Sequence, residues 1–174
     1  TLFVVLAVLI ERASGRRYAD VVNERVIEPA GLGATGFVRS DELPPEAAIG
    51  YLELTGLRSN VLHMPVVGVG DGGIYSTVTD LDRLWRAFYA GVIVPSDLVA
   101  LMVAPRPTGD EFRYGLGGFW LAASGPAAIM EGGDAGVSLR SIHDPTTHTT
   151  ATAVSNTSDG AWPVARLFVD IFAG

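Results

Sequence analysis

The sequence predicts an α/β fold of the α+β type, in which a helical region precedes antiparallel strands and one C-terminal helix. Three observations support this prediction. Apolar residues recur at helical spacing in several segments of residues 1–108, short runs bounded by Gly, Pro or Asp follow from about residue 109, and helical spacing returns at the C-terminus. Consecutive short strands with short connections predict an antiparallel meander. The 174 residues fit one domain, or most of one.

The N-terminal region is predicted to hold two helices. The first covers Thr1 to Ser14 and ends at Gly15, and the second covers Tyr18 to Ile27, because glycine and proline commonly follow the last helical residue. Residues 31–65 are predicted to be loop-like. The apolar run from Leu2 to Ile10 is shorter than the roughly 20 residues that span a bilayer. It therefore predicts a buried helix and no membrane segment.

Two further helices are predicted in the middle of the chain. Thr77 suits an N-cap, and Asp80 three residues later completes the pattern of a capping box. Pro95 opens a second short helix that runs to Met102. The helix behind the capping box presents one apolar face at helical spacing, made of Leu81, Leu84, Trp85 and Phe88.

The C-terminal third is predicted to contain four strands and a helix. The helix covers Trp162 to Phe172, and Pro163 suits its first turn. The strands are bounded by turn residues and cover Arg113–Ala122, Ala127–Glu131, Gly136–His143 and Thr149–Asn156.

The composition excludes several classes of function. Hydrophobic residues make up 48% of the chain and charged residues 18%, a profile that argues against disorder. The net charge of −7 and the pI near 4.8 argue against a nucleic-acid partner, which needs a basic surface. The chain has no cysteine, so it offers neither a disulfide nor a thiol nucleophile.

Neither a nucleotide cofactor nor a metal ion is predicted. Gly31–Gly36 and Gly68–Gly73 match G-x-G-x-x-G, but neither stretch lies within a βαβ unit, so both are expected to form turns. His143 and His148 are predicted to lie in a solvated hairpin, and with His63 they lack the spacing typical of metal ligands.

Six segments, in order along the chain, resemble one enzyme family. They are TLFVVLAVLIERASG (1–15), PAGLGATGF (29–37), DGGIYSTVTDLDRLW (71–85), YGLGGFW (114–120), GGDAGVSLRS (132–141) and residues 143–156. Together they resemble the serine β-lactamase-related family, which includes class C β-lactamases, D-alanyl-D-alanine carboxypeptidases and related esterases. The resemblance implies that residues 1–174 form the C-terminal part of a β-lactamase/transpeptidase-like domain, with a helical region to about 108 and the sheet and last helix after it.

The family's reactive centre is not expected in this chain. The resemblance implies acyl transfer, in which a serine attacks a carbonyl, a lysine one helical turn later accepts the proton, and a tyrosine relays it. All 12 cationic side chains of this chain are arginine, and a guanidinium stays protonated and cannot act as a base. We therefore expect Ser-x-x-Lys and Tyr-x-Asn upstream of Thr1, and no catalytic residue within these 174 positions.

The resemblance also implies a substrate-binding wall. In the family, a Lys-Thr-Gly or His-x-Gly triplet lies on a strand at the edge of the site, and a backbone N–H of that strand joins the oxyanion hole. Counting back from Gly136 places Met130 at the Lys/His position, whereas a turn one residue shorter places Glu131 there. In both frames the cation is missing. The predicted substrate-binding residues are Met130, Glu131, Gly132, Gly133 and Asp134.

The predicted function is that of a fragment of a serine hydrolase that acts on a small-molecule ester, amide or peptide without a cofactor. Two alternatives stay open. One is a β-lactamase or D-alanyl-D-alanine carboxypeptidase. The other is a non-catalytic binding protein on the same scaffold, which the unusual pair Met130 and Glu131 permits. An intact Ser-x-x-Lys upstream favours an enzyme, and its loss favours a binding protein.

Overall fold

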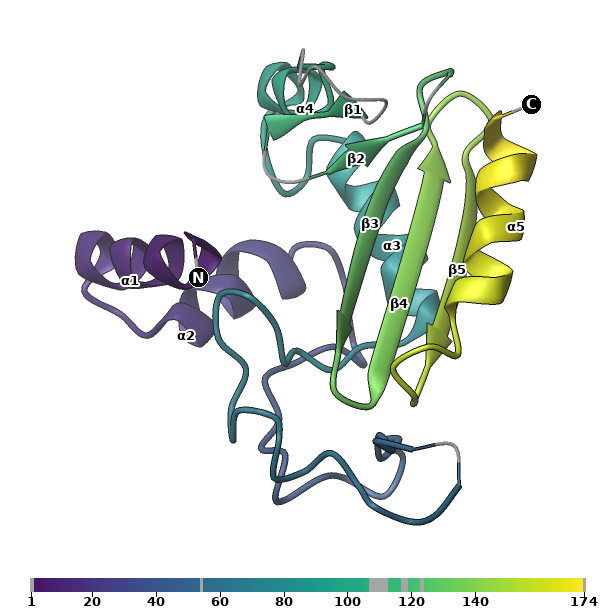
Figure 1. Ribbon diagram of the computed structural model, residues 1–174. Coiled ribbons are helices and arrows are strands. Elements are labelled where there is room, and N and C mark those ends of the chain that lie inside the picture. Colours follow the sequence, from purple (N-terminus) through teal and green to yellow (C-terminus); the bar gives the residue numbers. More distant parts are fainter. Residues whose placement is uncertain (1, 54, 107–112, 117–118, 123, 174) are drawn as a thin grey trace.

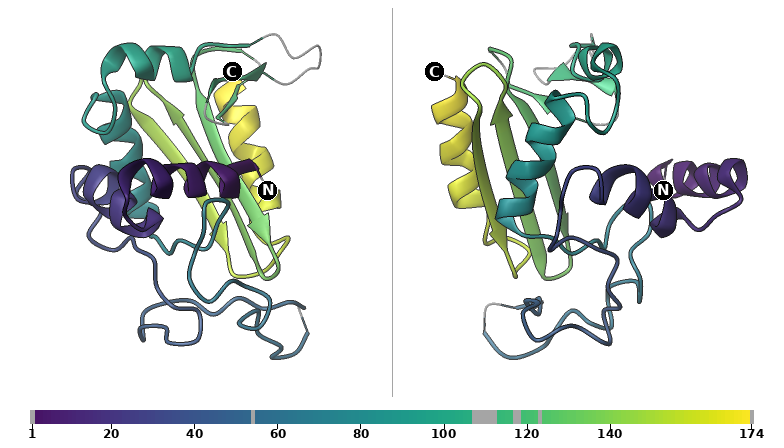
Figure 2. Two further views of the ribbon diagram at one scale, coloured as in Figure 1. Left: turned by 90° about the vertical axis from the view of Figure 1, so that its left-hand side faces the viewer. Right: turned by 180° about the vertical axis from the view of Figure 1, so that it is seen from behind.

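The chain folds around an antiparallel sheet with a helix packed on each face (Figure 1). The computed structural model describes residues 2–53, 55–106, 113–116, 119–122 and 124–173. Within these residues, α3 (Val78–Tyr89) covers one face and α5 (Trp162–Ala173) covers the other (Figure 2). The five described strands lie in chain order and are β1 (Arg113–Tyr114), β2 (Trp120–Leu121), β3 (Ala128–Asp134), β4 (Val137–Asp144) and β5 (Thr149–Ser155). The predicted α+β class and the antiparallel meander are confirmed.

The helices before the sheet follow the predicted ranges closely. The predicted helix over Tyr18–Ile27 consists of an α-helix that continues into one turn of π-helix. Gly15 ends the first helix in a left-handed conformation, with φ of +69°, which glycine adopts without a Cβ penalty. The bounds are α1 (Leu2–Ser14), α2 (Tyr18–Val22), η1 (Asn23–Ile27) and α4 (Ser96–Met102).

The prediction that Leu2 to Ile10 is buried is wrong for this structure. Ala7 is the buried residue of α1 and Val4 is half-buried, while the other apolar side chains from Leu2 to Ile10 are exposed. The helix projects away from the sheet (Figure 2). The loop at Gly70 approaches this helix closely, since a Cβ on Gly70 would lie 2.3 Å from the carbonyl oxygen of Phe3. No helix in the described residues is long and apolar enough to cross a bilayer.

The start of α3 has only one of the two hydrogen bonds of a capping box. The Asp80 side chain, expected to bond back to the Thr77 amide, makes tertiary contacts instead. Thr77 Oγ1 accepts a hydrogen bond from the Asp80 amide at 3.2 Å, as predicted. The buried Asp80 carboxylate instead accepts hydrogen bonds from Ala34 N at 2.8 Å, Thr35 Oγ1 at 2.9 Å and Arg83 Nη1 at 2.9 Å. Burial alone would raise the pKa of Asp80, but these donors outweigh it and lower the pKa. The carboxylate therefore ties the loop after η1 to α3.

The single strand predicted over Arg113–Ala122 is wrong. Two short strands pair antiparallel there, with Arg113 opposite Leu121 and Tyr114 opposite Trp120. The Gly115 amide after the first strand donates to the Phe119 carbonyl before the second at 3.0 Å. Residues 117–118 of the predicted strand lie outside the described residues, as does the predicted boundary near residue 108.

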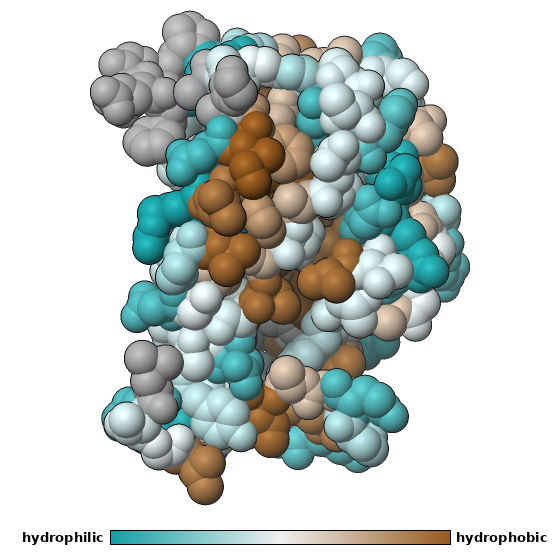
Figure 3. Space-filling view, turned by 90° about the vertical axis from the view of Figure 1, so that its right-hand side faces the viewer, coloured by the Kyte–Doolittle hydropathy of each residue, from teal (hydrophilic) through white to brown (hydrophobic). Residues whose placement is uncertain are grey.

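Two apolar cores lie on the two faces of the sheet because side chains alternate along each strand. The core under α3 contains Trp85, Phe88, Val99, Leu121 and Ala128. The core under α5 contains Ala122, Ala127, Ile129 and Ile142, with Phe168 and Phe172 of α5 packed against it. Val164, Leu167 and Ile171 of α5 are exposed, and apolar side chains gather on this face of the molecule (Figure 3).

Candidate substrate-binding site

All five predicted substrate-binding residues lie on β3, along a partly open edge. β4 pairs with β3 from Ala128 to Asp134, whereas β2 pairs only with Ala128 and Ile129. Past Ile129, no described strand pairs with the β2-side edge of β3. Backbone N–H and C=O groups on that edge are therefore available to a ligand. An extended substrate can bind such an edge through main-chain hydrogen bonds.

The two glycines of β3 differ in the room beside them. A Cβ on Gly132 would meet no atom within 4 Å, whereas a Cβ on Gly133 would lie 3.2 Å from Trp162 Cζ2. Gly133 is thus packed against the start of α5, while Gly132 leaves open space at the strand. The hairpin turn falls after both of them, where Gly136 has a φ of +74°.

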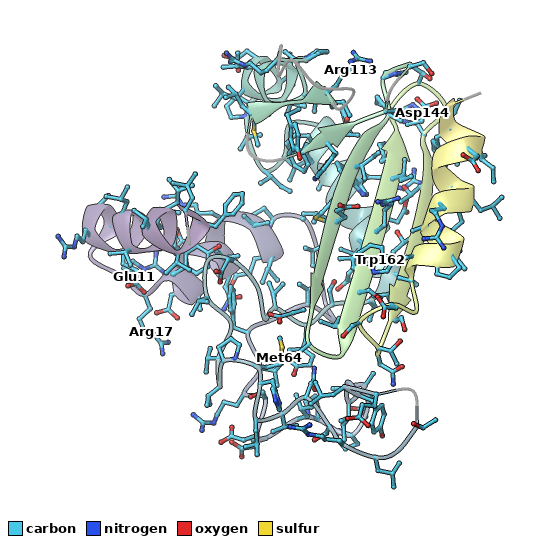
Figure 4. All side chains as sticks on the ribbon, in the orientation of Figure 1. Glu11, Arg17, Met64, Arg113, Asp144 and Trp162 are labelled. Atoms are coloured by element: carbon cyan, nitrogen blue, oxygen red, sulfur yellow. The ribbon has the colours of Figure 1, made fainter. Side chains whose placement is uncertain are left out.

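Met130 and Glu131 point to opposite faces of the sheet. Met130 packs on the core under α3 and lines an apolar cavity there. Glu131 faces α5 and forms an ion pair with Arg140, its cross-strand partner on β4, with Arg140 Nε at 2.8 Å from Glu131 Oε2. The Arg140 guanidinium also lies 5.8 Å from the ring centroid of Trp162 (Figure 4). Of the two possible triplet residues, Met130 is therefore the one on the cavity side.

Asp134 forms hydrogen bonds at the hairpin turn between β3 and β4. Its Oδ1 accepts a hydrogen bond from the Ala135 amide at 2.7 Å, and its carbonyl accepts one from Ser158 Oγ at 3.2 Å. The Ala135 carbonyl accepts a further bond from Asn60 Nδ2 at 3.0 Å. Loops from two distant parts of the chain thus hold the turn that ends β3, and the exposed Asp134 side chain caps it.

A buried polar cluster under α3 was missed by the sequence analysis. His143, predicted to be solvated, is 1% exposed. It stacks against both Trp85 and Tyr89, with ring centroids 5.8 Å and 5.1 Å away, and those two rings also stack on each other. Its Nδ1 lies 2.8 Å from Thr150 Oγ1, and Thr150 Oγ1 donates to Asp82 Oδ1 at 2.6 Å. The alternation of β4 is the signal that could have found it, since His143 shares a face with Ser141, which bonds α3.

The cluster is not a catalytic relay. Thr150 uses its single hydroxyl proton on Asp82, so His143 Nδ1 must donate to Thr150. Asp82 therefore contacts the threonine and not the imidazole, whereas a nucleophile–base–acid relay needs the base in the middle. The hydrogen bond from Arg86 lowers the pKa of Asp82 below its usual range. The cluster joins α3 to β4 and β5.

His143 should make the protein less stable in mild acid. Burial lowers the pKa of His143 below its ordinary 6.5, helped by Arg86 and opposed by Asp82. The unfolded chain therefore takes up a proton at higher pH than the native one, and the free energy of unfolding falls as the pH drops below 6.5. Urea unfolding across this range should show the slope, and His143→Gln should reduce it. An imidazole titration of His143 by NMR with a midpoint at or above 6.5 would contradict the prediction.

The buried serines of β4 also have structural roles. Ser141 Oγ accepts a hydrogen bond from Trp85 Nε1 at 2.8 Å and contacts Thr152 Oγ1 at 2.8 Å. Ser138 Oγ donates to the Thr157 carbonyl and accepts from the Ala161 amide. Neither contacts a base, so neither is placed as a nucleophile. The described residues contain no group of three His, Cys, Asp or Glu side chains that could hold a metal ion.

A match to one protein family extends over nearly the whole chain. The family model described as Beta-lactamase matches residues 1–173. The chain belongs to the beta-lactamase family. The resemblance to serine β-lactamase-related proteins is thereby confirmed, and this family places the chain among the serine hydrolases.

Curated proteins that are similar to this chain include penicillin-binding proteins and a peptidase. Over 120 residues the chain is 28% identical to the putative penicillin-binding protein PbpX of Bacillus subtilis, an alignment that covers 68% of this chain and 29% of that protein. Over 92 residues it is 33% identical to a D-aminopeptidase of Brucella ovis, covering 49% of this chain and 16% of that one. The chain spans less than a third of the length of either relative.

Solved structures of similar fold include a penicillin-binding protein from Bacillus halodurans. That structure has a TM-score of 0.89 and 27% identity over 97% of this chain and 54% of its own. A D-amino acid amidase from Ochrobactrum anthropi SV3 has a TM-score of 0.73 and 21% identity, over 95% of this chain and 55% of its own. The amidase shows the fold alone. In both cases the chain spans about half of the solved structure.

Proposed function

We propose that this chain forms the substrate-side wall of a serine hydrolase that acts by acyl transfer on a neutral ester or amide. The observation that carries the proposal is the position of Met130. It lies on the cavity face of β3, beside a strand edge without a described partner. In one of the two predicted frames, Met130 takes the position of the lysine or histidine of the family's triplet. A backbone N–H of this edge would join the oxyanion hole.

The preference for a neutral substrate follows from the charges around β3. Met130 offers a carboxylate no hydrogen-bond donor. Glu131 adds no cation, and its own charge is held by Arg140 on the other face of the sheet. A substrate carboxylate near Met130 would therefore lose its water without gaining a partner. This disfavours the alternative of a β-lactamase or D-alanyl-D-alanine carboxypeptidase, whose substrates carry such a group.

The nucleophile and its base would come from residues outside these 174. The chain has no lysine, and its two buried β4 serines are held in structural hydrogen bonds. The second candidate is a non-catalytic binding protein that uses the same wall, and it applies if the full-length protein lacks Ser-x-x-Lys. The absence of a lysine or histidine at Met130 or Glu131 is the observation that permits it. Comparing the hydrolysis of p-nitrophenyl acetate and nitrocefin by the full-length protein tests the proposal.

The chain by itself should form no acyl-enzyme. The chain has no lysine to serve as the family's base, so we expect no serine here to be activated for attack on a carbonyl. We expect no covalent adduct after incubation with a fluorescent penicillin or a fluorophosphonate, as measured by intact-mass spectrometry. A reactive penicillin-binding protein, treated in parallel, controls for probe quality. A stoichiometric adduct on any serine of the chain would show that the nucleophile lies within it.

A further inference from the structure

The cavity beside Met130 has the size and chemistry of a small-ligand site. Its volume is about 200 Å³, and its lining side chains are all apolar. The cavity is partly open, like the clefts that bind small ligands. An engineered apolar cavity of about 150 Å³ stays dry and binds benzene. A cavity of this kind therefore suits an apolar group about the size of one aromatic ring.

The walls of the cavity are held in place before any ligand binds. Trp85 and Phe88 of α3 are 2% and 5% exposed. The Trp85 ring is fixed by its Nε1 hydrogen bond to Ser141 and packs on Phe119, with centroids 5.4 Å apart. Met102 and Met130 complete the lining from α4 and β3. Rigid aromatic walls favour a preformed pocket, and two flexible thioethers allow it to adapt to ligands of different shape.

The charged side chains of α3 and Glu131 of β3 are engaged elsewhere. On α3, Arg83 pairs with Asp80 and Arg86 pairs with Asp82. Glu131 is turned to the opposite face. No lining side chain can therefore satisfy a charged ligand, whose burial without a partner is costly. The cavity should discriminate by charge as well as by size.

We propose that this cavity is a binding site for a neutral apolar group of about one aromatic ring, and that it receives the apolar part of the substrate. Met130 belongs both to the cavity lining and to the predicted substrate wall. Met130 and Gly132 share one face of β3, so a substrate lying along the strand edge at Gly132 has its apolar end directed at the cavity. The substrate role rests on the proposed function, whereas the binding site itself does not.

The three methionines give a direct test on the chain as it is. Met102 and Met130 line the cavity, and Met64 lies in the loop region at the opposite end of the sheet from α4 (Figure 4). With ¹³C-methyl-methionine labelling, toluene should shift the signals of Met102 and Met130 saturably and leave Met64 unchanged. Benzoate, which has the same ring with a carboxylate, should shift none of them. Absence of a toluene shift at Met130 up to its solubility limit would overturn the proposal.

Filling the cavity should remove the binding. Leu84→Trp places a larger side chain in the lining, and we expect toluene affinity to fall by at least about 10-fold, or about 1.4 kcal/mol. Leu98→Trp on α4, at a position 44% exposed and outside the lining, is the matched control and should bind as before. Ile93→Phe is a second filling variant in case Leu84→Trp does not fold. Toluene shifts that persist in a folded filling variant would contradict the assignment.

The binding and hydrolysis results separate the two proposals. Neither the toluene titration nor its variants need a nucleophile. Toluene binding together with a full-length protein that hydrolyses no ester would support the site and refute the proposed function. Ester hydrolysis without toluene binding would refute the site and support the function. If both hold, the full-length protein should hydrolyse p-nitrophenyl phenylacetate in preference to p-nitrophenyl acetate.

Discussion

Replacing Trp85 with alanine is expected to lower the free energy of unfolding by about 3–5 kcal/mol. Trp85 is 2% exposed and packs between Phe88, Tyr89 and His143 under α3. Its removal takes away the largest fully buried side chain and the hydrogen bond that joins α3 to Ser141 of β4. Domains of this size are stable by roughly 5–15 kcal/mol, so the variant should unfold at a much lower urea concentration.

Two further variants separate packing from hydrogen bonding at this position. Trp85→Phe keeps an aromatic ring and loses the Nε1 donor, so we expect a smaller loss, of about 1 kcal/mol for the hydrogen bond plus a packing cost. Leu101→Ala on α4, at a position 46% exposed, is the matched surface control and should change stability by less than about 0.5 kcal/mol. If Trp85→Ala cost no more than Leu101→Ala, α3 would not be fixed to the sheet by this residue.

Local patterns predicted the elements well because their signals lie within a few residues. Leu81, Trp85 and Phe88 recur at helical spacing, and all three are buried under the predicted face of α3. Thr77 caps that helix as expected. The second half of the capping box was wrong because Asp80 bonds residues more than 40 positions away, at Ala34 and Thr35. Contacts at such separation leave no trace in local spacing.

The sequence placed the candidate residues on one strand, but it could not tell which face of the sheet each side chain occupies. Alternation along β3 shows that Met130 and Glu131 face opposite sides, but only the packing of α3 and α5 tells which side is which. The same packing determines whether His143 is buried, because α3 covers that face of β4. The N-terminal helix was wrongly predicted to be buried for a similar reason. The apolarity of Leu2 to Ile10 does not tell whether another part of the structure packs on this helix.

The full-length protein is expected to hydrolyse neutral esters better than β-lactams. A penicillin-type substrate carries a carboxylate, which the family's lysine or histidine can meet and Met130 cannot. A hydrogen bond to a charged group contributes about 1.5–3 kcal/mol, so about 10- to 100-fold in kcat/KM depends on this side chain. The measurement is kcat/KM for p-nitrophenyl acetate and for nitrocefin with the unmodified protein and with Met130→His.

The two frames of the triplet give a matched pair of variants. Met130→His places a donor on the cavity face and should raise kcat/KM for nitrocefin toward the ester value. Glu131→His places the same side chain on the α5 face and breaks the pair with Arg140, so it should give no gain and some loss of stability. A gain in Glu131→His alone would move the triplet by one residue. Efficient nitrocefin hydrolysis by the unmodified protein, unimproved by either histidine, would shift the substrate assignment to β-lactams, because no cation at this strand would then be needed.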